Sequence, residues 1–148
     1  MITTGLLDAH AAAPLIAAYA AEMRPLLRGA AVPRAEDAAS LLDGTLLLGA
    51  FDAGEPVGFL LLLDLPEIVF ARRCGQVEDL FILPSHRRRG AARALLAAAA
   101  AEAAARNFSH LRWFVPEGDA AAIALYETMA ERAGWRGFIL RLDADASL

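Results

Sequence analysis

The sequence predicts one α/β domain with a mixed β-sheet and helices on both faces. In the first half of the chain, two aliphatic runs of strand length, within residues 45–63, flank a short polar turn, which is typical of an antiparallel hairpin. In the second half, residues 77–115, two such runs flank a helical segment, as in a β-α-β unit. The length of 148 residues fits a single domain.

Six segments have the aliphatic, β-branched and aromatic composition of strands. They are Ile2–Leu7, Thr45–Phe51, Pro56–Leu63, Val77–Leu83, Leu111–Val115 and Trp135–Leu142. The second and third are joined by Asp52–Glu55, whose residues suit a hairpin turn. In the last segment Phe138, Leu140 and Leu142 alternate with other residues, so they share one face of the predicted strand. The stretch Asp64–Gly75 is expected to be irregular.

Four segments are predicted to be helical. They are Ala9–Arg24, Pro33–Leu42, an alanine-rich segment that ends at Arg106, and Ala120–Arg132. Asp8 and Asp119 stand where helix N-caps are expected. Pro14 leaves a second possible start for the first helix, because proline is tolerated in a first turn. Pro25 is expected to end that helix, and Gly134 to end the last one.

The loop Arg87–Ala92 is the best-defined motif, and it lies between a predicted strand and a predicted helix. The first N–H groups of a helix have no internal acceptor, and the helix dipole adds partial positive charge there. Gly90 and the alanines after it let an anion approach the backbone closely. The loop is therefore predicted to hold a phosphate or pyrophosphate group. The signatures of nucleoside-triphosphate and dinucleotide loops are absent from the sequence.

A second motif follows the loop: Asp119, Ala122 and Tyr126 have the spacing of an asparagine, an alanine three residues later and a tyrosine four after that. The loop Arg87–Ala92 itself matches the pattern Q/R-x-x-G-x-G/A. Together the two motifs resemble those of the GNAT N-acetyltransferase superfamily. The context around Val77–Ile82 and around the tyrosine is similar to the polyamine and diamine acetyltransferase branch.

The resemblance covers Val57–Leu142 well and the first fifty residues loosely. The chain departs from the family pattern at three positions: Asp119 replaces an asparagine, and Ala92 and Ala130 stand where glycines are common. The resemblance implies a GNAT-like fold, in which a mostly antiparallel sheet is splayed between two neighbouring strands. It also implies homodimers, which are common in the family.

Acetyl-CoA is the co-substrate that the resemblance implies. Backbone N–H groups of the loop would hold its pyrophosphate, the strand before the loop would pair with its pantetheine arm, and an N–H near Ile82 would stabilise the developing oxyanion. The implied contact residues are Leu80, Phe81, Ile82, Arg87, Arg88, Arg89, Gly90, Ala91, Ala92, Arg93, Asp119 and Ala122.

The resemblance implies that Tyr126 donates a proton to the leaving thiolate, although on spacing alone it would be a half-buried helix tyrosine. Glu78 is implied as the base or amine anchor, and Asp79 is the second candidate. Adjacent strand residues point to opposite faces, so at most one of the two faces the acyl group unless the strand bulges. Trp113 could contact a cationic amine, with core packing as its alternative role.

The first helix of the family overhangs the acceptor site, so Tyr19 and Glu22 are weaker candidates for contact with the acceptor. We expect a small amine, with a diamine, a polyamine or a diamine-like amino acid first. A protein N-terminus or an aminoglycoside is an alternative acceptor. Alternatives of other classes are a non-catalytic acyl-CoA-binding regulatory module and an RNA-binding module built on Arg87–Arg89.

Composition restricts these functions further. The formal net charge of −4 argues against a nucleic-acid partner and suits a cationic substrate. Cys74 is the only cysteine, which fits a reducing cytoplasm, and it lies outside both motifs, which favours direct acetyl transfer. No signal peptide or membrane span is expected from the apolar runs. His10, His86 and His110 lack the spacing of metal ligands, so no metal is expected.

Overall fold

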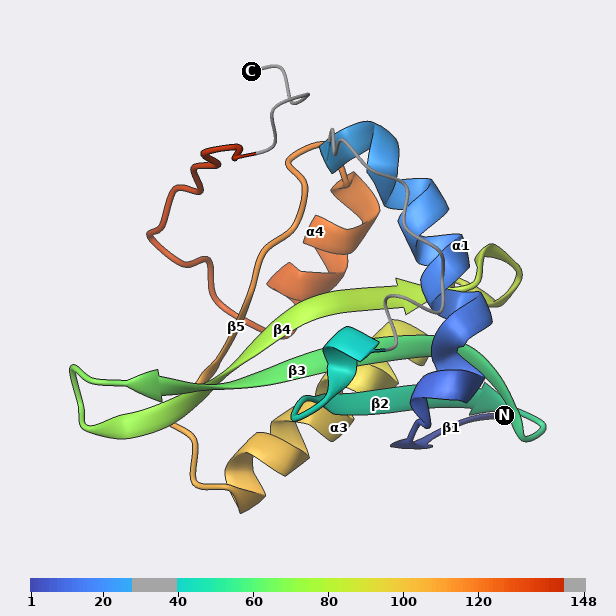
Figure 1. Ribbon diagram of the computed structural model, residues 1–148, viewed down its shortest axis with the longest axis horizontal. Coiled ribbons are helices and arrows are strands. Elements are labelled where there is room, and N and C mark those ends of the chain that lie inside the picture. The colour runs from blue at the N-terminus through green and yellow to red at the C-terminus, as the bar shows by residue number, and fades with distance from the viewer. Residues whose placement is uncertain (28–39, 143–148) are drawn as a thin grey trace.

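The computed structural model describes residues 1–27 and 40–142. Its described residues form a five-stranded sheet of order β1-β2-β3-β4-β5 (Figure 1). Strands β1 to β4 pair antiparallel in succession, and β5 pairs parallel to β4. The elements are β1 (Ile2–Leu6), α1 (Ala9–Leu27), η1 (Ser40–Leu42), β2 (Leu46–Asp52), β3 (Glu55–Glu67), β4 (Arg72–Ile82), η2 (Pro84–His86), α3 (Ala91–Ala105), β5 (Leu111–Trp113) and α4 (Ala120–Glu127). The predicted mixed α/β class is confirmed.

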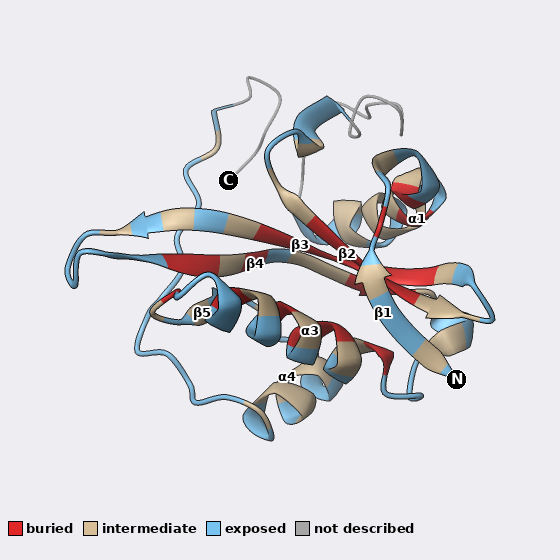
Figure 2. Cartoon of the chain, turned by 90° about the horizontal axis from the view of Figure 1, so that it is seen from below, coloured by how far each residue is buried: buried red, intermediate tan, exposed pale blue. Residues whose placement is uncertain are grey.

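Helices cover both faces of the sheet: α1 lies on one side, and α3 and α4 lie on the other (Figure 2). Successive strand residues point to opposite faces, so β3 contributes to two hydrophobic clusters. Leu60 packs in the cluster that includes Leu95 and Leu96 of α3. Its neighbour Leu61 packs in the cluster that includes Leu15 of α1. This alternation explains why the central strands read as nearly continuous apolar runs.

Two short polar segments act as the sequence predicts. The side chain of Asp8 accepts hydrogen bonds from the N–H groups of His10 (2.9 Å) and Ala11 (3.3 Å), so α1 begins at Ala9 and not near Pro14. The turn between β2 and β3 has positive φ at both central residues, Ala53 (51°) and Gly54 (86°), as a tight hairpin turn requires.

Three predicted boundaries are wrong. Helix α1 continues through Pro25 to Leu27, because a proline close to a helix end disrupts little of the helix beyond it. The stretch Asp64–Gly75 is not irregular: β3 extends to Glu67 and β4 starts at Arg72, and an ion pair between Arg73 and Asp64 (2.5 Å) joins the two strands. Helix α4 ends at Glu127, not at Arg132.

The predicted strand Trp135–Leu142 does not form. No strand pairing is found for these residues within the described part of the chain, and its large apolar side chains are exposed. Of the predicted helix Pro33–Leu42, only Ser40–Leu42 lies within the described residues, where it forms a 3₁₀ turn. Among the described helices, none has both the length and the apolar character needed to cross a bilayer.

The sheet opens between its last two strands. Strand β5 pairs with β4 only over Gly75–Val77, whereas β4 continues to Ile82. The edge of β4 from Glu78 onward is therefore unpaired on the side of β5. This is the splay that the resemblance implies, and it leads directly into the loop before α3.

Candidate active site

A β-bulge lies at the open edge of β4. Leu61 pairs with Asp79 and Leu62 pairs with Val77, so Glu78 is the extra residue on its strand. A bulge re-aims neighbouring side chains, so the strict alternation expected for two adjacent carboxylates does not apply here. Glu78 is exposed and accepts a hydrogen bond from the side chain of Gln76 (2.6 Å). Its charge contributes to raising the pKa of Asp79.

Asp79 joins β4 to α1. Its carboxylate accepts a hydrogen bond from the Tyr19 hydroxyl at 2.7 Å. Burial raises the pKa of the Asp79 carboxyl, the hydrogen bond from Tyr19 lowers it, and the charge of Glu78 raises it further. The Tyr19 ring packs against Phe59 (5.6 Å between centroids) and Phe81 (5.7 Å). An aromatic cluster of Tyr19, Phe59 and Phe81, which we call the aromatic wall, therefore lies beside the bulge together with the half-buried carboxylate of Asp79.

Tyr126 approaches this region from α4. Its ring packs edge-on against Trp113, with 5.6 Å between centroids. Burial raises the pKa of Tyr126, and the negative charge of Asp119 raises it further. The hydroxyl makes no hydrogen bond to any described residue, so its proton is available to a ligand. Tyr126 also contributes to the raised pKa of Tyr19, which indicates that the two phenols share one region.

The second motif has a local structural explanation. Asp119 is the N-cap of α4, and its carboxylate accepts a hydrogen bond from the N–H of Ala122 at 3.1 Å. Aspartate and asparagine are equally good N-caps, so the departure from the family pattern preserves the start of the helix that carries Tyr126.

The loop before α3 presents backbone donors. The N–H groups of Arg88, Arg89 and Gly90 donate no hydrogen bond to other described residues. The first-turn N–H groups of α3 follow them and have no acceptor within the helix. Gly90 caps this helix in the left-handed region (φ 81°), and a Cβ there would meet no atom within 4 Å. An anion can therefore approach these donors without steric hindrance from Gly90.

The arginine side chains of this region have different roles. Arg87 donates to the carbonyl of Ile82 (2.9 Å) and to Glu22 (2.8 Å). Arg89 donates to Asp52 (2.9 Å), and Arg93 donates to the hydroxyl of Thr128 (2.8 Å). Arg88 has no hydrogen bond or ion pair with another described residue. The side chain of Arg88 is thus free for a ligand, whereas Arg87 and Arg89 hold the loop and Arg93 connects α3 to the C-cap of α4.

No pattern in the sequence indicated Asp52 as a partner of the loop, because Asp52 and Arg89 are 37 positions apart. Glu22 was a candidate for acceptor contact, and the structure instead places its carboxylate against Arg87. The structure brings Tyr19, Glu78 and Asp79 together at the splay. Trp113 lies against Tyr126, so a contact between Trp113 and an amine stays a prediction.

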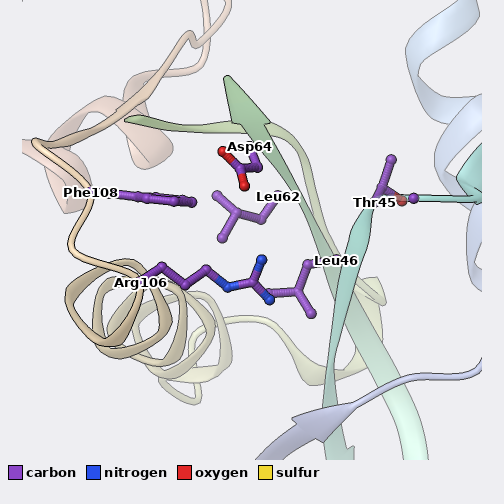
Figure 3. Close-up of a pocket in the computed structure, with 7 residues that line it drawn as sticks. Thr45, Leu46, Leu62, Asp64, Arg106 and Phe108 are labelled. Atoms are coloured by element: carbon purple, nitrogen blue, oxygen red, sulfur yellow. The ribbon is translucent and has the colours of Figure 1, made fainter. Parts of the chain in front are cut away.

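Two hollows are found in the described structure, and the second includes Trp113 in its lining. The first, of about 280 Å³, includes Asp64, Arg106 and Phe108 in its lining (Figure 3). The second, of about 370 Å³, is an apolar groove between α3, β5 and the chain after α4. Neither contains a carboxylate of the bulge or an N–H group of the loop. Within the described residues, no cluster of three or more histidine, cysteine, aspartate or glutamate side chains could hold a metal ion.

Comparison with known proteins places these features in a family. A family model described as "Acetyltransferase (GNAT) family" matches residues 13–130, which include the bulge, the loop and Tyr126. A curated relative, thialysine N-epsilon-acetyltransferase of Caenorhabditis elegans, is 33% identical over 105 residues. That match covers 66% of this chain and 62% of the nematode protein, so the chain spans less than two thirds of its relative.

Solved structures agree on the fold. A ribosomal-protein-alanine N-acetyltransferase from Brucella melitensis biovar Abortus 2308 is 35% identical, with a TM-score of 0.81, and the match covers 97% of this chain and all of the other. An aminoglycoside acetyltransferase from an uncultured soil metagenomic sample is 25% identical, with a TM-score of 0.76 and coverage of 97% and 99%.

Proposed function

The chain belongs to the acetyltransferase (GNAT) family, and we propose that it moves the acetyl group of acetyl-CoA directly to a primary amine. One observation carries the proposal. The N–H groups of Arg88 to Gly90 and the Tyr126 hydroxyl, which belong to the two family motifs, make no hydrogen bond to other described residues, and the edge of β4 between them has no neighbouring strand beyond Val77. Cys74 is buried within β4, which argues against a covalent acetyl-cysteine route.

Binding of the donor uses backbone groups. The N–H groups from Arg88 to Arg93 are suited to a pyrophosphate, because they combine unpaired donors with the positive end of the α3 dipole. The free side chain of Arg88 adds a full positive charge. The open edge of β4, which includes Leu80, Phe81 and Ile82, offers main-chain groups to the pantetheine arm, as an added strand would use them.

Two proton transfers accompany the reaction. A cationic alkylamine must lose a proton before it attacks the thioester, and the leaving thiolate must gain one. The Tyr126 phenol is the proposed acid, and its raised pKa keeps it protonated at neutral pH. Glu78 is the proposed base or amine anchor, directly or through water. Asp79, held by Tyr19, is the second candidate, and as an anion it would attract the cationic amine.

For the acceptor, we propose a small cationic amine. The support is the pair of carboxylates at the bulge beside the aromatic wall of Tyr19, Phe59 and Phe81. The curated relative, by its name, acts on the ε-amino group of an amino acid. A protein N-terminal alanine is the second candidate, because the structure of a ribosomal-protein-alanine acetyltransferase matches this chain over nearly its whole length.

The decisive experiment compares kcat/KM for CoA release with five acceptors: a diamine, a matched monoamine, a neutral-tailed amine, an alanine-starting peptide and an aminoglycoside. A second positive charge should favour the diamine over the monoamine by one or two orders of magnitude, because a carboxylate in a partly dry cleft attracts it. Glu78→Gln should reduce activity on the diamine and flatten the rise of rate with pH. Equal values for the three small amines, or activity on the peptide alone, would contradict the acceptor proposal.

The setting of the reaction is also proposed. We expect the enzyme to act in the cytoplasm, where its one cysteine would stay reduced.

We also propose a homodimer. The support is the segment Trp135–Leu142, whose large apolar side chains are between 65% and 89% exposed in the single chain.

A further inference from the structure

The backbone of the loop is strained at Arg88. Its φ of 64° lies in the left-handed region, which residues other than glycine rarely adopt. Such a conformation persists only where the surrounding structure holds it, and it is frequent where a ligand is gripped. Two residues on, Gly90 is also left-handed (φ 81°), so the backbone between them turns sharply and leaves its N–H groups unpaired.

Side-chain hydrogen bonds of the residues on both sides of Arg88 hold this conformation. Before it, the side chain of Arg87 donates to the carbonyl of Ile82 and to Glu22 of α1. After it, the guanidinium of Arg89 donates to Asp52, the last residue of β2, at 2.9 Å. His86 also contacts Asp52: its Nε2 lies 3.6 Å from Oδ2, the oxygen that accepts from Arg89.

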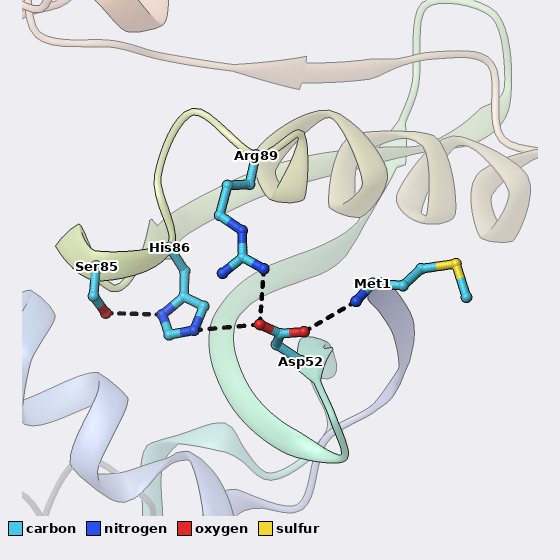
Figure 4. Close-up of polar contacts among 5 residues, drawn as sticks. All are labelled: Met1, Asp52, Ser85, His86 and Arg89. Carbon is cyan, nitrogen blue, oxygen red and sulfur yellow. Dashed lines mark hydrogen bonds and ion pairs between the residues drawn. The ribbon is translucent and has the colours of Figure 1, made fainter.

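Figure 4 shows how these groups converge on one carboxylate. Asp52 meets Arg89 and His86 through Oδ2, and its Oδ1 accepts from the amino group of Met1 at 3.1 Å. The His86 ring is held in turn by the Ser85 hydroxyl, 2.8 Å from its Nδ1. The side chain of Asp52 is only 20% exposed, so the hairpin between β2 and β3 is anchored firmly to the loop.

We propose that Asp52 is a positioning residue for the donor site: by holding Arg89 and His86 it keeps the N–H groups of the loop aimed at a pyrophosphate. The inference rests on the proposed function. Asp52 is itself an anion beside an anion site, so its charge alone would weaken phosphate binding. If Arg89 acted only by direct contact with the phosphate, removal of the Asp52 charge would strengthen CoA binding. If Asp52 positions the loop, the same change weakens CoA binding.

The test measures CoA affinity by calorimetry and, separately, kcat/KM with acetyl-CoA and with acetyl-pantetheine, which lacks the pyrophosphate. Asp52→Asn keeps the shape of the side chain and weakens its ion pair with Arg89, and it should raise the Kd for CoA about two- to fivefold, as expected for a partly exposed ion pair. Activity with acetyl-pantetheine should stay unchanged. Glu102→Gln is the matched control, because Glu102 pairs with Arg106 at 2.9 Å at the far end of α3.

Arg89→Gln breaks the same tie and leaves the contact between Asp52 and Met1 in place. It should give a similar loss, and the double variant should bind no more weakly than either single variant. Unchanged or tighter CoA binding by Asp52→Asn would overturn the inference, as would additive losses. An equal loss with acetyl-pantetheine would also overturn it, because a general structural defect would then explain the effect. If the wild-type protein binds no CoA, the proposed function itself fails.

Discussion

At the scale of single residues, the candidate site depends on phenols and carboxylates in partly dry surroundings. Tyr126 and Tyr19 both have raised pKa values, mainly through burial, but their hydroxyl groups differ. Tyr19 donates to Asp79, whereas Tyr126 donates to no described residue. The Tyr19 hydroxyl is therefore occupied in binding Asp79, whereas the Tyr126 hydroxyl can donate its proton to a ligand.

Tyr126→Phe should lower kcat about ten- to thousandfold and leave the affinity for acetyl-CoA nearly intact, because the ring and its contact with Trp113 remain while the proton donor is lost. Steady-state kinetics and CoA calorimetry on the same preparation check this. Tyr19→Phe is the matched change of the other tyrosine, and its larger effect should be on the KM of the amine. Wild-type turnover by Tyr126→Phe would remove this residue from the mechanism.

At the scale of elements, the central feature is the passage from β4 through the loop into α3. The bulge at Glu78, the free edge beyond Val77 and the left-handed residues Arg88 and Gly90 follow one another within a short stretch of chain. The bulge changes the direction of the side chains beside it, and the free edge and the loop leave backbone N–H and C=O groups without a partner strand or helix. A strand end, a loop and a helix start thus form one continuous set of donors for an extended ligand.

Gly90→Glu should weaken CoA binding at least about tenfold, because it adds a strained side chain and a negative charge beside the helix N-terminus. Calorimetry with CoA measures the loss. Gly44→Glu is a closely matched control: Gly44 has φ 79° and, like Gly90, has no atom within 4 Å of an added Cβ. Gly44→Glu should bind CoA as the wild type does, and the same affinity in both variants would contradict the loop assignment.

At the scale of the whole molecule, the sheet has a short edge strand, and the segment Trp135–Leu142 leaves its large apolar side chains exposed in the described structure. Strand β5 has three residues and pairs only with β4 in the described structure. Phe138 and Leu140 are more than 80% exposed. Exposed apolar surface of this kind marks an interaction site, which is the physical basis for the proposed homodimer.

The double substitution Phe138→Ser and Leu140→Ser should convert the proposed dimer to monomer, as measured by sedimentation velocity across a concentration series. An aromatic side chain buries roughly 150–250 Å² on contact, so a reciprocal contact through this segment could contribute much of the roughly 1,200 Å² that a stable interface needs. Phe70→Ser is the matched control, since Phe70 is 74% exposed at the tip of the β3–β4 hairpin. A wild-type monomer, or a dimer lost only with Phe70→Ser, would contradict the proposal.

Features that depend on neighbouring residues could be predicted from the sequence. The cap at Asp8, the turn at Ala53 and Gly54, and the strand, loop and helix around Gly90 follow from local side-chain and backbone preferences. Apolar runs were sufficient to predict that strands β1 to β5 exist, although not the full length of β3 and β4, and the spacing of Asp119, Ala122 and Tyr126 indicated the helix that carries the candidate acid.

Other features were decided only by the tertiary structure. Pairing with β3 decides both the bulge at Glu78 and the strand structure of residues 64–75, because register is a property of two strands together. The tie between Asp52 and Arg89 joins segments far apart in sequence. The segment Trp135–Leu142 has the pattern of a strand but no partner in the described chain, and a strand forms only where a neighbour accepts its hydrogen bonds.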